Sequence, residues 1–147
     1  NTARRLSRLH VIVYRLTGGV LGRRLVRNDM LLLTTRGCTT GRAHTVPLLY
    51  LQEGDTLVVV ASWGGRPRDP DWYRNLVAQP RASVQVRSKT WSVRTRTASP
   101  DERDAWWPRI VAAYAGYRTY QSRTDRIIPV VMLEPYPPPG NRSFRAT

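Results

Sequence analysis

MLLLTTRGCTTGRAHTVPLLYLQEGDTLVVVA, residues 30–61, is the stretch that decides the fold. It holds three short runs rich in leucine, valine and threonine, at 30–35, 45–51 and 56–61. Runs of this length, bounded by glycine and polar residues, are typical of β-strands. The stretch therefore predicts the first half of a β-sheet.

Three further runs of the same kind follow downstream, at 82–87, 90–97 and 127–133. The links 36–44, Glu53-Gly54-Asp55 and Ser88-Lys89 are short and polar or contain glycine, as in antiparallel hairpins. Six antiparallel strands of this size predict a small closed barrel. With the helices described next, the expected fold class is α+β, mainly β.

Helices are predicted at three places between the strands. The first covers 71–78 and is bounded by a proline on each side. The second begins with Ser99-Pro100-Asp101-Glu102, in which an N-cap serine, a first-turn proline and a glutamate at the third helical position form a capping box. A shorter helical segment is expected after Gly116.

The two ends of the chain differ from this middle part. Residues 1–27 carry an apolar stripe with arginines between its members, which predicts a basic amphipathic helix; the stripe consists of Leu6, Leu9, Val13, Leu16 and Val20. Such a helix packs on the core or lies on an anionic membrane surface. Residues 136–147 are rich in proline and predicted to be disordered. We therefore expect one barrel domain over 28–135.

The charge of the chain is strongly positive, with 24 Lys and Arg against 10 Asp and Glu, a net charge of +14. Such a surface attracts nucleic acid, anionic lipid or an anionic small molecule. The aromatic residues do not alternate with arginines in an RNA-binding pattern, which disfavours nucleic acid. A small anionic ligand and an anionic membrane stay as the expected partners.

Metal binding and disulfide formation are disfavoured by the side chains present. Cys38 is the only cysteine, and His10 and His44 are not spaced as a metal pair. No apolar run approaches the roughly 20 residues that span a bilayer, and no signal peptide is visible. The predicted location is the cytoplasm, with peripheral contact at the inner face of the plasma membrane.

The first candidate site is the link between the first two predicted strands. Its glycines leave backbone N–H groups accessible to phosphate, its hydroxyls add donors and its arginines add charge. A hairpin loop without a ligand is the alternative. The candidate residues are Arg36, Gly37, Cys38, Thr39, Thr40, Gly41, Arg42 and His44.

The second candidate follows the predicted strand 56–61 and consists of Ala61, Ser62, Trp63 and Gly64. Small residues there allow a flat ring to lie close to the backbone, whose N–H groups bond its carbonyls. A plain glycine turn is the alternative.

Two further candidates lie on the predicted helices. Trp72 and Leu76 are four residues apart and are expected to face the core together. Asn75 is expected to be exposed to solvent by default, and a polar contact is the alternative. Tyr114 and Tyr120, with Tyr117 between them, suit a lid over a flat aromatic ligand, and a place at the core edge is the alternative.

Taken in order, five motifs of this chain resemble the deazaflavin-dependent nitroreductase family over about residues 30–135. The last motif is long, and the five agree in sequence order. They are LLLTTRG at 31–37, TGR at 40–42, VVVAS at 58–62, WYRNL at 72–76 and YRTYQSRTDRIIPVV at 117–131.

This resemblance implies a six-stranded antiparallel split β-barrel related to the flavin-dependent pyridoxamine phosphate oxidases. It also implies coenzyme F420, an 8-hydroxy-5-deazaflavin with a phosphate and an oligoglutamate tail. The loop Gly37 to His44 would hold the phosphate and the start of the tail. Ala61 to Gly64 would border the ring, and Trp72 and Asn75 would flank the coenzyme.

The implied reaction is hydride transfer from the reduced coenzyme to a quinone, a nitroaromatic or an activated alkene. Tyr114, Tyr117 and Tyr120 would line or close the substrate pocket. Ser62 and Tyr120 are the expected catalytic residues, as hydrogen-bond donors to the developing oxyanion. The resemblance leaves the chain a monomer or a weak dimer.

The sequence departs from the family in the phosphate loop, where Cys38, Thr39 and His44 replace three cationic residues. A charge-assisted contact to phosphate contributes roughly 1.5–3 kcal/mol, so these changes lower the predicted affinity for the coenzyme tail. Two alternatives stay open at this point: an FMN-dependent oxidoreductase on the same barrel, and a noncatalytic binder of lipid or haem.

Overall fold

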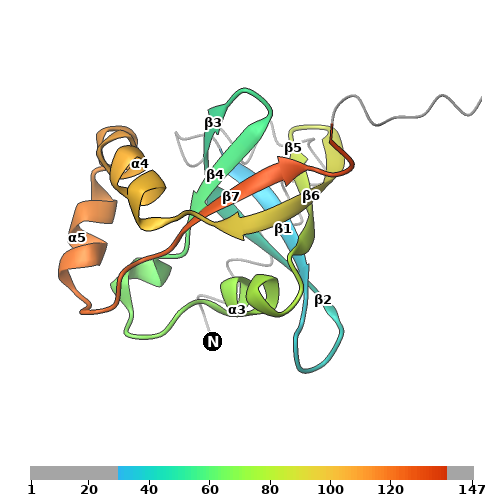
Figure 1. Cartoon of the computed structure of the whole chain (residues 1–147). Helices are drawn as coiled ribbons and strands as arrows, with labels where there is room; N and C mark the ends of the chain where they lie inside the picture. Colours follow the sequence, from blue (N-terminus) through green and yellow to red (C-terminus); the bar gives the residue numbers. More distant parts are fainter. Residues whose placement is uncertain (1–29, 139–147) are drawn as a thin grey trace, which may run out of the picture.

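The computed structural model describes residues 30–138 (Figure 1). The predicted helix over 1–27 and the last nine residues lie outside the described part of the chain. Seven strands form one sheet, and their bounds are β1 Met30–Arg36, β2 Ala43–Leu49, β3 Leu51–Glu53, β4 Thr56–Val60, β5 Arg81–Val86, β6 Lys89–Thr97 and β7 Val130–Pro135.

The order of the strands shows that the sheet is closed. It runs β2-β1-β5-β6-β7-β4-β3, and every pairing is antiparallel. The strands β2 and β3 stand at opposite edges of this order, yet only Tyr50 separates them in the chain. The two edges of the sheet must therefore lie side by side, so the sheet is rolled into a barrel.

The same feature corrects the predicted strand 45–51. Its first part pairs with β1 and its last part pairs with β4, at the other edge of the sheet. The chain changes partner at Tyr50, which belongs to neither strand. Continuous apolar character cannot reveal a change of pairing partner, so six predicted strands become seven. The predicted class, α+β with a mainly β split barrel, is confirmed.

The predicted hairpins are confirmed, and two of the predicted boundaries differ in position. The β5–β6 turn lies at Arg87 and Ser88, one residue earlier than expected, because Val86 pairs with Lys89. The last strand starts at Val130 and not at residue 127. Ile127 is 73% exposed and precedes the sheet.

The three helices appear where the sequence placed them: α3 is Asp71–Ala78, α4 is Pro100–Ala113 and α5 is Gly116–Ser122. The capping box is formed, since Ser99 accepts from the Glu102 N–H and the Glu102 carboxylate accepts from the Ser99 N–H. Among the described residues, no helix is long and apolar enough to cross a membrane.

The core has two parts because β4 is buried on both faces. Leu57 and Val59 pack inside the barrel, where Trp72 and Leu76 of α3 join them as predicted. The alternate residues of β4, Val58 and Val60, pack in a second cluster with side chains of α4 and α5. Full burial of a Val or Leu side chain contributes roughly 1.5–3 kcal/mol, so both layers stabilise the same strand.

The antiparallel order also gives the barrel two distinct ends. The strands β1, β4 and β6 run in one direction and finish at the same end, which we call the site end. The link 37–42, the segment 61–70 and α3 belong to it (Figure 1). The tight turns at 54–55 and 87–88 lie at the other end, which we call the turn end.

Candidate functional site

The link between β1 and β2 is a folded loop with internal hydrogen bonds. The Gly37 N–H donates to the Arg42 carbonyl at 2.7 Å, and the Gly41 N–H donates to the Gly37 carbonyl at 2.8 Å. A Cβ atom on Gly37 would lie 2.7 Å from the Thr40 hydroxyl and 3.0 Å from Nε2 of His44. Glycine at this position therefore allows these two polar side chains to approach the backbone closely.

Asn75 ties this loop to α3. Its Oδ1 accepts from the Cys38 N–H at 3.0 Å, and its Nδ2 donates to Oγ1 of Thr35 at 3.1 Å. The residue is only 5% exposed, so the default expectation of solvent contact was wrong. A buried amide needs partners, and here each end of the amide has one.

A hollow of about 280 Å³ lies between the loop and α3. Arg74 forms an ion pair with Asp71 at its edge. Within residues 30–138, the N–H groups of Thr39 and Thr40 donate to no other atom. Hydroxyls, N–H groups and a guanidinium are the donors that phosphate and carboxylate require. The hollow is lined by Gly37, Cys38, Thr39, Thr40, His44, Asp71, Arg74 and Asn75.

Arg74 and Asp71 were not among the predicted site residues. Arg74 lies in the motif WYRNL at 72–76, but the i,i+3 spacing of Asp71 and Arg74 is common on helix surfaces and did not single them out. Of the predicted members of the loop, Arg36 is engaged in the loop itself, since its Nη1 donates to the Gly41 carbonyl at 3.2 Å. Arg42 is exposed and lies outside the lining of the hollow.

The segment after β4 forms a tight turn with unusual backbone angles. Ser62 is helical, with φ −80° and ψ −38°, whereas Trp63 and Gly64 have positive φ values of 42° and 64°. A right-handed residue followed by a left-handed one directs successive N–H groups into a concave nest that binds anions and carbonyl oxygens. Trp63 is 43% exposed, and the Arg66 guanidinium lies 4.6 Å from its ring centroid.

A single arginine holds the back of this turn. Arg126 donates from Nη2 to the Ser62 carbonyl at 2.8 Å and from Nη1 to the Ala61 carbonyl at 3.2 Å. Its Nη1 also pairs with Asp69 at 3.0 Å, and its Nε donates to the Arg66 carbonyl at 2.9 Å. Sequence reasoning missed this residue, although it lies inside the longest motif.

The turn packs directly against α5 through Gly65. A Cβ atom at this position, where φ is 77°, would lie 2.3 Å from the Tyr120 carbonyl oxygen. This contact is with the Tyr120 backbone, whereas the Tyr120 hydroxyl lies 3.7 Å from the position of a Cβ on Gly116. The turn that carries Ser62 and the helix that carries Tyr120 are therefore neighbours. Ser62 itself is 8% exposed.

The three tyrosines form a row in which neighbouring rings meet edge to face. The ring centroids are 6.1 Å apart for Tyr114 and Tyr117 and 5.8 Å apart for Tyr117 and Tyr120. Tyr117, in the middle, is 7% exposed, and its burial raises the pKa of its hydroxyl far above the ordinary value. The Tyr114 hydroxyl donates to the Tyr50 carbonyl at 3.3 Å. The structure therefore places Tyr114 and Tyr117 at the helix-side core and leaves Tyr120 as the member beside the turn.

Trp72 is also placed in the core. It is 7% exposed and meets Tyr73 edge to face at 6.2 Å. Its indole packs in the barrel core, and the α3 residues that line the hollow are Asp71, Arg74 and Asn75.

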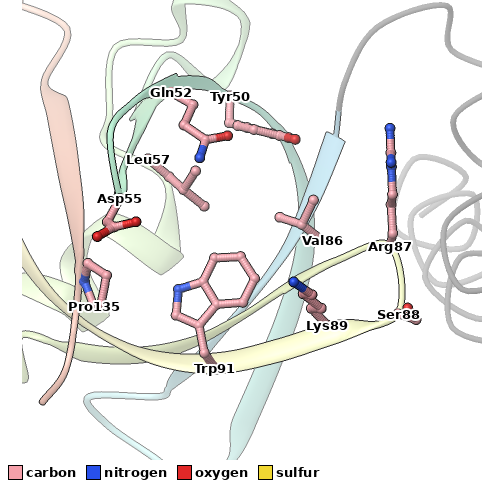
Figure 2. A pocket seen from close by; sticks show the side chains of 10 residues that line it. All are labelled: Tyr50, Gln52, Asp55, Leu57, Val86, Arg87, Ser88, Lys89, Trp91 and Pro135. Carbon is pink, nitrogen blue, oxygen red and sulfur yellow. The ribbon is translucent and has the colours of Figure 1, made fainter. Parts of the chain in front are cut away.

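A larger hollow of about 730 Å³ opens at the turn end (Figure 2). Trp91, Leu57 and Val86 point into it, with Lys89 near its edge. None of the residues predicted for the coenzyme or substrate belongs to its lining, which is completed by Tyr50, Gln52, Asp55, Arg87, Ser88 and Pro135.

The closed barrel, with the hollow and the nest at the same end, is the split-barrel architecture of F420-dependent reductases. Within this class, the chain belongs to the F420H(2)-dependent quinone reductase family, whose family model matches residues 6–135.

Known proteins agree with this assignment. An F420H(2)-dependent quinone reductase of Mycobacterium tuberculosis is 41% identical over 132 residues, 87% of this chain and 89% of that protein. The structure of an F420-H2 dependent reductase, FDR-A, is 40% identical with a TM-score of 0.66, covering 72% of this chain and 94% of that one. A domain-swapped dimer is 33% identical with a TM-score of 0.69, covering 91% and 100%.

These findings confirm the resemblance drawn from the five motifs. The protein is an F420-dependent oxidoreductase, and its coenzyme is F420, so the FMN alternative is not needed. The donor set of the site end fits this coenzyme, because the hollow suits an anionic phosphate and the nest suits ring carbonyl oxygens.

Proposed function

We propose that the site end binds reduced F420 in two places and that the acceptor of its hydride is a quinone. The hollow beside α3 would take the phosphate and the start of the tail, and the nest at Ser62 to Gly64 would take the ring. The observation that carries this proposal is that the two donor sets open at one end of the barrel, joined by α3.

The phosphate position depends on Arg74 in this chain. The loop carries Cys38, Thr39 and His44 where the family has cations, whereas Arg74 faces the hollow from α3. A guanidinium there supplies positive charge beside the altered loop and would donate to phosphate oxygens. Asp71 holds Arg74 in the absence of ligand and is displaced from it when phosphate binds.

The coenzyme supplies the hydride, and the chain supplies position and hydrogen bonds. When a quinone accepts a hydride, negative charge develops on a carbonyl oxygen. Ser62 and Tyr120 would donate to that oxygen, which lowers the barrier most in a site that excludes water. Tyr114 and Tyr117 would support Tyr120 from the core side.

A quinone is favoured over a nitroaromatic or an activated alkene as the natural acceptor. The family model and the mycobacterial relative are both described as quinone reductases. Quinones are apolar, and the basic amphipathic segment 1–27 would bring the protein to an anionic membrane that holds them. The proposed location is accordingly the cytoplasm with peripheral membrane contact, and the proposed state is a monomer or weak dimer.

The test is a titration with oxidised F420 followed by single-turnover oxidation of reduced F420 by menadione, a nitroaromatic and an activated alkene in parallel. The expected result is saturable binding and fastest turnover with menadione. Binding without preference for the quinone would contradict the acceptor, and no binding would contradict the site. Sedimentation with anionic vesicles at low salt, with and without residues 1–27, tests the membrane contact separately.

A further inference from the structure

We propose that Arg126 is a positioning residue that holds the N–H groups of Ser62 and Trp63 in the orientation that receives the coenzyme ring. This inference rests on the proposed ring position at the nest. Arg126 itself lies behind the turn, so it acts through the backbone and not by touching the coenzyme.

The contacts of Arg126 are concentrated on one segment. Its guanidinium donates to the carbonyls of Ala61, Ser62 and Arg66, and it pairs with the Asp69 carboxylate. The Arg126 side chain is 15% exposed, and its bonds to Ala61, Ser62 and Asp69 are partly buried. One guanidinium thus fixes both ends of the turn and its middle.

The orientation of the N–H groups follows from peptide geometry. In a trans peptide the carbonyl of one residue and the N–H of the next point in opposite directions. Among the described residues the only cis bond is Tyr136-Pro137, so the two peptides of the turn are trans. Because the Ala61 and Ser62 carbonyls face Arg126, the N–H groups of Ser62 and Trp63 must face away from it.

These N–H groups are not used by the protein itself. Within the described part of the chain, neither the Ser62 nor the Trp63 N–H donates to another backbone atom. The Ala61 N–H, in contrast, donates to the Pro129 carbonyl at 2.9 Å, directly beyond the paired part of β4 and β7. The N–H of Ala61 is therefore bound within the protein, whereas the next two N–H groups, those of Ser62 and Trp63, are available to a ligand. This change occurs where Arg126 begins to bind the backbone carbonyls.

The turn needs such a clamp because its backbone is strained. Trp63 has a φ of 42°, which is unfavourable for a bulky residue and persists only where the surroundings enforce it. Arg126 is in turn held from behind, because Gln121 Nε2 donates to its carbonyl at 2.9 Å. Loss of the guanidinium leaves the turn free to relax toward ordinary angles, and the nest is lost.

The variants are Arg126→Lys, Arg126→Ala and Asp69→Asn, with Arg96→Ala as the matched control. Arg96 is also an arginine with carboxylate partners, Glu102 and Glu134, but it contacts no atom of the turn. Lysine keeps the charge of residue 126 and cannot hold two carbonyls in a planar fork.

The readouts are the dissociation constant of oxidised F420 by fluorescence, the absorption band of the bound coenzyme, and ¹⁵N–¹H shifts of Ser62 and Trp63 in the ligand-free protein. We expect about tenfold weaker binding for Arg126→Lys and more than that for Arg126→Ala, with the two amide shifts moved. Asp69→Asn should weaken binding about threefold, and Arg96→Ala should change neither readout.

A purely structural role predicts a different pattern. If folded Arg126→Lys binds F420 like the parent and leaves both amide shifts in place, the positioning role is wrong. If the parent protein does not bind F420, the proposed function fails, while the shifts still report whether Arg126 controls the turn. Should Arg126→Ala not fold, the lysine and asparagine variants decide the question.

Discussion

The two ends of the barrel are built in different ways. At the site end, polar side chains that are distant in sequence hold the backbone: Asn75 bonds Cys38 across 37 positions and Arg126 bonds Ser62 across 64. At the turn end, two short turns close neighbouring strands, and apolar side chains such as Leu57 line the hollow. This difference indicates that long-range polar contacts hold the site end, whereas local turns between neighbouring strands form the turn end.

The largest effect is expected from Gly65→Ala. The new methyl group meets the Tyr120 carbonyl oxygen at 2.3 Å at a φ of 77°, so both sterics and backbone angle oppose it. We expect a loss of about 3–5 kcal/mol in the free energy of unfolding, from left-handed strain and forced backbone shifts together. Urea denaturation measures it, and F420 binding should be lost in parallel.

Two glycine variants serve as controls for that change. Gly54→Ala at the turn end and Gly64→Ala in the same turn as Gly65 both have positive φ values, with no atom within 4 Å of the new Cβ. Each should cost only about 1–2 kcal/mol. Equal losses for all three variants would show that the contact between the turn and α5 carries no weight.

Leu57→Ala tests the turn end by itself. Leu57 is 2% exposed, and its removal should cost about 3 kcal/mol, as for other buried leucines. The affinity of the folded protein for F420 should stay unchanged, because no site residue touches this hollow. A change of tenfold or more in F420 affinity would show that the two ends are coupled.

Asn75→Ala, at the site end, should lower both the stability of the protein and its affinity for F420. It removes the partners of the Cys38 N–H and the Thr35 hydroxyl in a buried place, which should cost about 2 kcal/mol. F420 should bind at least fivefold more weakly, because the loop loses its link to α3. The variant Gln85→Ala, which loses one exposed hydrogen bond to the Arg87 carbonyl, is the matched control and should change stability by less than about 0.5 kcal/mol.

The smallest effect is expected from a charge that belongs to neither end. The hydrogen bond from Arg96, followed by that from the Ser99 N–H, lowers the pKa of Glu102 from 4.5 to about 2. A carboxylate with a depressed pKa stabilises the folded protein above its unfolded pKa, and this contribution is lost as pH falls from 4.5 toward 2. In Glu102→Gln, acid titration of stability should be shallower over that range, with F420 affinity at neutral pH unaltered.

Much of the fold could be predicted because its signals are local. Prolines bound α3, a capping box starts α4, and glycine turns join hairpin partners. Each depends on residues within one or two turns of chain. The resemblance of the five motifs also allowed the coenzyme to be predicted. The order of the motifs identified the family even where single residues were ambiguous.

The features that could not be predicted from the sequence depend on contacts between residues that are distant along the chain. The split of the second predicted strand at Tyr50 follows from pairing with β4, which no feature of residues 45–51 encodes. Asn75 was assigned to solvent because an amide on a helix surface is usually exposed, and its partner loop lies far away in sequence. Arg126 was overlooked since an arginine bonding three carbonyls has the same sequence signature as a solvated one.

The position of β7 has a consequence for the biosynthesis of the protein. This strand is the last of the described strands, yet it lies between β6 and β4 in the sheet. Before β7 has been made, the hairpins can form, but the sheet lacks the strand that joins its two halves. The edges of β4 and β6 therefore stay unpaired until β7 joins them, and unpaired strand edges are prone to aggregation.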